Sequence, residues 1–305
     1  MNVTSTRAAL LAALAGNLLI AITKFIAAYW TGSSAMLSEG FHSLVDTSNE
    51  LLLLYGQHRA GRPPDRTHPL GYGRELYFWS FIVAVLIFGL GAGLALYEGV
   101  QHVLEPVPGG DYTVNYVVLG LSFLFELASW QVAFRNFSNA KGDAGFWEAI
   151  LRSKDPPAFI VLLEDSAALI GLAIAACGIA AADFLDMPIF DGVASIGIGL
   201  LLALTALFLA RESKSLLIGE AASPEITQAI RRIAASDPAV ERVVQLFTVH
   251  LAPDQVVAFL ELDLRDLRTA QIEQAIQRIE ESIQSEMPSV IATYIKPPDA
   301  SAPAP

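Results

Sequence analysis

The stretch AMLSEGFHSLVDTSNELLLLYG, residues 35–56, has the length of a membrane span and carries four ionisable residues: Glu39, His42, Asp46 and Glu50. On a helix, their spacings of three and four residues place all four side chains along one face. An ionisable group inside a bilayer costs at least about 2.5–3.5 kcal/mol. We therefore expect this polar stripe to face other helices or water rather than lipid.

The composition of the whole chain is that of a polytopic membrane protein. Of its 305 residues, 53% are hydrophobic and only 16% are charged, far from the balance of an ordinary soluble domain. A net charge of -12 argues against a nucleic-acid partner, which would require clustered Lys and Arg. The single cysteine, Cys177, cannot form an intrachain disulfide.

Six apolar runs have about the 20 residues needed to cross a hydrocarbon core of about 30 Å. They cover residues 8–29, 34–56, 77–98, 114–134, 158–180 and 188–209. Lys and Arg follow the second, fourth and sixth runs, whereas the other three connections contain none. The positive-inside rule then predicts that both termini are cytoplasmic. Lys24 lies inside the first run, and it either reaches toward the interface or pairs with an acidic neighbour.

After the sixth run, polar and apolar residues alternate, which predicts a small soluble domain. Ser223 and Pro224 are typical of a helix start. The predicted elements are a helix within residues 223–238, strands at 240–251 and 255–264, a helix at 269–287 and a strand at 289–296. This α-β-β-α-β order predicts an α+β fold with helices on one face of a sheet. A domain of this size has a marginal core, which makes dimerisation plausible.

The predicted domain organisation is therefore a six-helix transmembrane domain at 1–218, a soluble domain at 219–297 and a flexible Pro/Ala-rich tail at 298–305.

The polar stripe of the second run suits a divalent cation. Neutral His42 offers nitrogen and Asp46 offers oxygen, a pairing that fits zinc and its neighbours. The fifth run adds Glu164 and Asp165, adjacent acids that point about 100° apart on a helix, so that only one can face the second run squarely. The more ordinary alternative for His42 is an interhelical hydrogen bond.

The other membrane acids have simpler interpretations. Glu39 is expected to cap the second span, and Glu50 to line a vestibule. Glu126 is expected to accept a hydrogen bond, and Asp191 to cap the sixth span.

Three features together resemble the cation diffusion facilitator family of divalent-metal/proton antiporters. They are the six spans followed by an α-β-β-α-β tail, the stretch SSAMLSEGFHSLVD at 33–46 and the stretch HPLGYGRELYFWS at 68–80. The family's two ligands in the second span fall on His42 and Asp46. The resemblance implies a homodimer formed through a cytoplasmic, ferredoxin-like C-terminal domain.

The chain departs from the family pattern in the fifth span. The two ligand positions there fall on Val161 and Asp165, so that Asp165 is the favoured ligand and Glu164 the substitute for the donor that Val161 cannot provide. SKDP at 153–156 followed by VLLEDSAALIG at 161–171 resembles a divergent branch that includes a mitochondrial zinc transporter. The implied metal ligands are His42, Asp46, Asp165 and Glu164.

Two further metal sites of the family lack some of their usual histidine ligands in this sequence. In the loop after the second span, Tyr72 stands where many members have a metal-binding His, leaving Asp65 and His68. In the soluble domain, His250 is the only histidine. The resemblance therefore implies no strong metal site outside the membrane.

The predicted function is export of Zn²⁺, or alternatively Mn²⁺, Fe²⁺, Co²⁺ or Cd²⁺, from the cytoplasm in exchange for protons. Metal and protons compete for the same groups, and His42 is the favoured proton carrier because its ordinary pKa of about 6.5 lies near ambient pH. The partners are the metal ion, protons and the lipid bilayer, with the bacterial plasma membrane as the expected location. We expect no cofactor beyond the transported ion.

Other functions predict other features. An intramembrane metalloenzyme would need an H-E-x-x-H pair, which the spans lack, so that we expect no enzymatic activity. A proton-coupled exporter of organic cations would need aromatic cages, and a metal sensor would bind metal without transporting it.

Overall fold

A computed structural model describes residues 3–106, 113–142, 145–266 and 268–298. It divides into two compact units, Met1–Arg59 with Phe78–Lys214, and Ala60–Tyr77 with Ser215–Pro305. All but one residue of the predicted tail lies outside the described residues.

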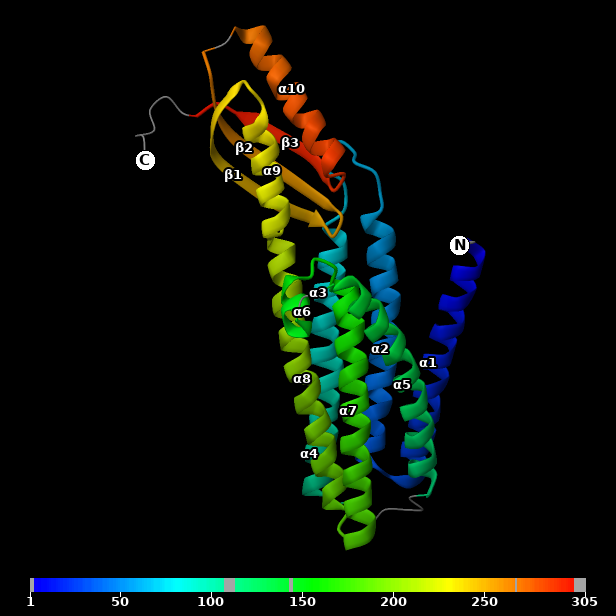
Figure 1. The fold of residues 1–305 in the computed structure, drawn as a ribbon. Coiled ribbons are helices and arrows are strands. Elements are labelled where there is room, and N and C mark those ends of the chain that lie inside the picture. The colour runs from blue at the N-terminus through cyan, green and yellow to red at the C-terminus, as the bar shows by residue number, and fades with distance from the viewer. Residues whose placement is uncertain (1–2, 107–112, 143–144, 267, 299–305) are drawn as a thin grey trace. The chain divides into compact units, whose positions relative to one another are not determined.

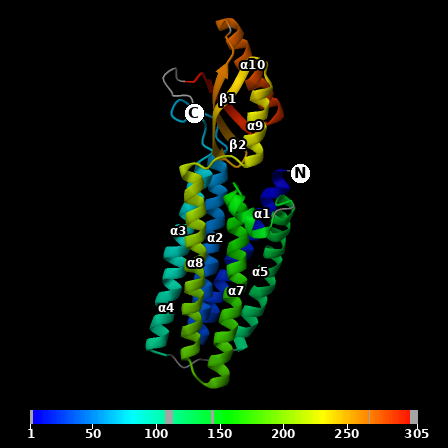
Figure 2. The ribbon, with the colours of Figure 1, turned by 60° about the vertical axis from the view of Figure 1, so that its left-hand side comes forward.

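The first unit is a bundle of long helices (Figures 1 and 2). In chain order these are α1 (Val3–Thr31), α2 (Ser34–Ala60), α3 (Glu75–Leu86), the π-helical turn η1 (Ile87–Ala92), α4 (Gly93–Leu104), α5 (Thr113–Ala140), the short α6 (Phe146–Arg152), α7 (Pro156–Leu185) and α8 (Ile189–Ile218). The helices extend beyond the predicted apolar runs because a helix continues outside the hydrocarbon core that the runs measure. The sequence gives no sign of α6 or of the π-helical turn.

Within the described residues, four helices are long and apolar enough to cross a membrane: Glu75–Leu104, Thr113–Asn139, Pro156–Leu185 and Ile189–Ile218. In α1 the stretch Asn17–Thr31 is a shorter apolar helix. Helix α2 has 27 residues, a length of about 40 Å, and its polar stripe lowers its hydropathy. The chain is thus a multi-pass membrane protein, and the count of six spans stays a prediction.

Glycines bring α4 and α8 into close contact. A Cβ added to Gly99 would lie 2.7 Å from the backbone nitrogen of Ile196, and one added to Gly192 would lie 3.0 Å from that of Val103. Small residues allow membrane helices to approach in this way.

Asp191 of α8 caps the start of α2. Its carboxylate accepts hydrogen bonds from the Ser33 hydroxyl at 2.8 Å, the Ser34 N–H at 2.5 Å and the Ala35 N–H at 3.4 Å. The Ser34 and Ala35 donors are backbone N–H groups that a helix start leaves unpaired. The expectation that Asp191 caps its own helix is therefore wrong, because the free N–H groups of α2 lie within its reach.

The second unit contains α9 (Pro224–Ser236), β1 (Val240–Ala252), β2 (Gln255–Leu264), α10 (Thr269–Glu286) and β3 (Val290–Lys296). The strands form one sheet in the order β1-β2-β3, with β1 and β2 antiparallel and β2 and β3 parallel. The element order is the α-β-β-α-β order that the sequence predicts. Its identification as ferredoxin-like stays a prediction.

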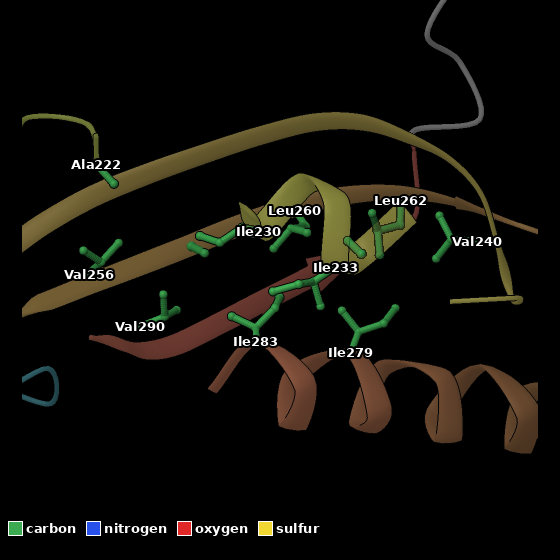
Figure 3. Packing of buried hydrophobic residues seen from close by; sticks show 12 residues of the cluster. Ala222, Ile230, Ile233, Val240, Val256, Leu260, Leu262, Ile279, Ile283 and Val290 are labelled. Carbon is green, nitrogen blue, oxygen red and sulfur yellow. The ribbon is translucent and has the colours of Figure 1, made fainter. Parts of the chain in front are cut away.

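Both helices of this unit pack on one face of its sheet (Figure 3). Ile230 and Ile233 of α9 meet Ile279 and Ile283 of α10 above the inward-facing residues of the strands. The N-cap of α9 is Ser223, whose side chain accepts from the Ile226 N–H at 3.4 Å, as the sequence predicts.

Candidate metal centre

A small cavity between helices of the first unit is lined by five carboxylates: those of Asp46, Glu50, Glu126, Glu164 and Asp165. They come from α2, α5 and α7. The cavity has a volume of about 20 Å³, enough for about one water molecule. Its remaining lining residues are uncharged: Asn17, Ile20, Ser43, Ser129 and Val161. Acids gathered in this way favour a cation.

Glu164 and Asp165 both reach this cavity, from neighbouring positions on α7. The Asn49 side chain of α2 donates to Glu164 Oε1 at 2.7 Å, and the Ser129 hydroxyl of α5 donates to Asp165 Oδ2 at 2.8 Å. The expectation that Asp165 is the acid facing α2 is therefore wrong, because Glu164 is hydrogen-bonded to α2 and Asp165 to α5. The cavity is lined by residues of α1, α2, α5 and α7, so that two α7 side chains about 100° apart both border it.

His42 lies beside Asp46 but is not among the residues that line the cavity. Its Nδ1 is 3.5 Å from Asp46 Oδ1, and its side chain is 2% exposed. Within the described part of the chain, neither ring nitrogen of His42 nor Oδ1 of Asp46 has a hydrogen-bond partner. Buried polar atoms are normally paired, because leaving them unpaired costs free energy. An ion bound at Asp46 would offer His42 such a partner.

The predicted ligands are brought together without forming a finished coordination shell. Asp46, Glu164 and Asp165 share the cavity and His42 adjoins Asp46. Residues 3–106, 113–142, 145–266 and 268–298 nonetheless contain no group of three or more His, Cys, Asp or Glu side chains arranged to hold a metal ion. A bound ion would therefore require these side chains to close around it.

A second cavity, of about 170 Å³, adjoins the first and shares Glu50 and Val161 with it. It continues along α2 past Leu53, Leu54 and Gln57, toward the Ala60 end of that helix. Glu50 accepts a hydrogen bond from the Asn17 side chain of α1 at 3.0 Å. Glu50 thus borders both cavities, and the identification of the second cavity as the vestibule stays a prediction.

Two charged residues have roles that the sequence did not assign. Glu126 lines the cavity, although the sequence predicts only a hydrogen-bond acceptor there. Glu39 forms a buried ion pair with Lys24, with Nζ 3.0 Å from Oε2, so the expected capping role of Glu39 is wrong. In the sequence, the only indication of these roles was that Glu126 and Glu39 are charged residues within apolar runs.

The loop between α2 and α3 is closed by hydrogen bonds to Asp65. The Tyr72 hydroxyl donates to Asp65 Oδ2 at 2.7 Å, and the N–H groups of Thr67 and His68 donate to Oδ1. The Tyr72 hydrogen bond and then that from the His68 N–H hold the pKa of this exposed carboxyl below its usual value. In the sheet, His250 is buried with its Nδ1 3.1 Å from the Ala252 carbonyl oxygen.

Comparison with known proteins places the bundle among metal transporters. Residues 10–218 match the family described as "Cation efflux transmembrane domain". The human "Proton-coupled zinc antiporter SLC30A9, mitochondrial" is 35% identical over 79% of this chain and 43% of its own length. The Arabidopsis thaliana "Metal tolerance protein C4" is 35% identical over 81% of this chain and 54% of its own length.

A third relative matches this chain over a larger share of its own length. The "Cation-efflux pump FieF" of Cronobacter sakazakii is 27% identical over 93% of this chain and 89% of its own length. The chain thus spans about half the length of the more similar relatives and nearly all of this one.

Proposed function

The chain belongs to the cation diffusion facilitator family of metal transporters, and on that premise we propose that it exports Zn²⁺ from the cytoplasm in exchange for protons. The relatives named as a zinc antiporter and a metal tolerance protein support this substrate class. Mn²⁺, Fe²⁺, Co²⁺ and Cd²⁺ are the alternative ions, because the cavity is rich in carboxylates.

The observation that carries the proposal is the set of carboxylates from three helices around one ion-sized cavity, beside a buried histidine. We assign His42, Asp46, Glu164 and Asp165 as the metal ligands. Val161 lines the same cavity with an apolar side chain, and Glu164 supplies the oxygen that Val161 lacks. A volume of about 20 Å³ suits an ion better than an organic cation.

Proton coupling follows from the chemistry of these ligands. Carboxylates must be ionised and His42 must be neutral to bind a metal ion, so protons and metal compete for one site. The ion reaches the site through the vestibule, past Glu50, and is bound between α2 and α7. As the helices rearrange to open the opposite side, protons displace the ion and return on His42 or a carboxylate.

The proposed organisation has six spans in a transport domain at 1–218, with both termini in the cytoplasm and the bacterial plasma membrane as the location. The ferredoxin-like domain at 219–297 joins two copies into a homodimer. Dimerisation is supported by the exposed sheet face of the second unit, where Phe259 stacks on Tyr294 with ring centroids 5.3 Å apart.

The test is Zn²⁺ binding to the purified full chain by titration calorimetry at several pH values. We expect binding to weaken as pH falls, by about tenfold per pH unit for each proton that the ion displaces. Repeating the titration in buffers of different ionisation enthalpy counts the released protons. Asp183→Asn, at an exposed site on α7, is the matched control for substitutions at the centre.

Absence of Zn²⁺ binding by the wild type, and of binding by the four alternative ions, would overturn the proposal. Binding without proton release would contradict the proposed exchange of metal for protons at this site.

A further inference from the structure

We propose that Glu39 is a second proton-binding site, separate from the metal ligands, and that it controls metal affinity through the charge of Lys24. The inference rests on the proposed function, because it concerns how protons weaken metal binding at that same centre.

Glu39 and Lys24 form an ion pair that is completely enclosed by the bundle. Lys24 Nζ on α1 is 3.0 Å from Glu39 Oε2 on α2, and both side chains are 0% exposed. The same ammonium group donates to the Ser43 hydroxyl at 2.7 Å. Charges are rare inside membrane proteins and usually functional when present, so this pair requires an explanation beyond helix packing.

Only one oxygen of the Glu39 carboxylate is paired. Oε1 has no hydrogen-bond partner among the residues that the structure describes. It lies against Gly171 of α7, where an added Cβ would be only 2.6 Å from it. This oxygen is therefore free to receive a proton while Oε2 keeps its contact with Lys24.

Few other titratable groups surround Glu39. Lys24 faces it from α1, His42 lies one turn farther along α2, and Glu126 of α5 is close enough to interact electrostatically. Helix α7 presents the backbone of Gly171 at this point rather than a charged side chain. Lys24 also acts electrostatically on His42, Asp46 and Glu126, but among the described residues the carboxylate that it contacts directly is that of Glu39.

Lys24 is connected to the cavity by one hydroxyl group. Ser43, which accepts its hydrogen bond, lines the carboxylate cavity. While Glu39 is ionised, the pair has no net charge. Once Glu39 takes up a proton, the charge of Lys24 is uncompensated at the edge of the cavity and repels a divalent cation.

The pair also lies on the side away from the vestibule. Glu50, where the vestibule begins, is eleven residues after Glu39, about 16 Å farther along the α2 axis. Glu39 lies toward the Ser34 end of the helix, so a proton that arrives from that end meets Glu39 before the cavity. One proton bound there promotes release of the metal ion without touching its ligands.

The experiment is a cycle of two variants, Glu39→Gln and Lys24→Met/Glu39→Gln, with Zn²⁺ affinity measured by calorimetry above neutral pH. Glutamine imitates a permanently protonated Glu39, so Glu39→Gln should bind Zn²⁺ at least about tenfold more weakly than wild type. Removing the ammonium group as well should return the affinity to within about threefold of wild type.

The inference would be overturned if Glu39→Gln bound Zn²⁺ with the affinity of wild type. It would also be overturned if the double variant bound Zn²⁺ as weakly as Glu39→Gln does. If Glu39→Gln does not fold, the double variant still decides at a lower pH, where Glu39 of the metal-free wild type carries a proton. There the double variant should release fewer protons per Zn²⁺ bound than wild type, and an unchanged number would overturn the inference. Failure of the wild type to bind any of the tested ions would instead remove the proposed function.

Discussion

Asp46→Asn should weaken Zn²⁺ binding by at least about 100-fold, since even loss of a group that only supports a metal ligand costs about 10–100-fold. Asp46 lines the carboxylate cavity and contacts His42, with Oδ1 3.5 Å from Nδ1. The amide has nearly the same shape but lacks the charge, so the variant removes attraction for the ion without opening a void. Zn²⁺ titration of the purified variant measures the effect.

The control for Asp46→Asn is Asp183→Asn, which makes the same chemical change at an exposed position of α7. We expect wild-type binding from the control and an unchanged thermal unfolding curve from both variants. Binding by Asp46→Asn within threefold of wild type would mean that the ion binds elsewhere.

Glu164→Gln should reduce Zn²⁺ affinity by about 10-fold to 100-fold, and Val161→His in the same chain should restore most of it. Glu164 and Val161 both border the cavity, and a histidine at 161 would replace the lost oxygen with a nitrogen ligand. Nitrogen ligands favour zinc over manganese. We therefore expect the Zn²⁺/Mn²⁺ affinity ratio of the double variant to exceed that of wild type.

Titrations with both ions test this substitution directly. Asn49, which donates to Glu164 Oε1 at 2.7 Å, can also donate to the glutamine oxygen, so the single variant should remain folded. A Glu164→Gln chain with unchanged Zn²⁺ affinity would show that Glu164 is not a ligand and that three donors suffice.

The sequence predicted the elements of the fold better than the contacts between them. The order of strands and helices after Ser223 follows from alternation and helical spacing, and the structure has that order. The polar stripe of α2 was visible in the same way. Helical periodicity reports which residues share a face, but it does not report which neighbour that face meets.

The contacts that could not be predicted join residues far apart in the chain. Asp191 caps a helix that begins 157 positions earlier, and Glu164 receives its hydrogen bond from a residue 115 positions away. Lys24 could be recognised as unusual, but its partner among several acids depends on how α1 rotates against α2. Such choices are set by packing of the whole bundle rather than by local spacing.

The most direct test of the account is Zn²⁺-driven proton movement in proteoliposomes that contain the full chain and a pH-sensitive dye. With wild type, Zn²⁺ uptake into the vesicles should be matched by protons moving outward. A proton gradient with the vesicle interior more acidic than the outside should therefore accelerate the uptake. Asp165→Asn, which alters a cavity carboxylate on α7, should abolish both movements, whereas Asp183→Asn should preserve them. Zn²⁺ uptake that proceeds without proton movement, or a wild type that binds the ion but moves neither, would contradict metal/proton exchange at the centre between α2 and α7.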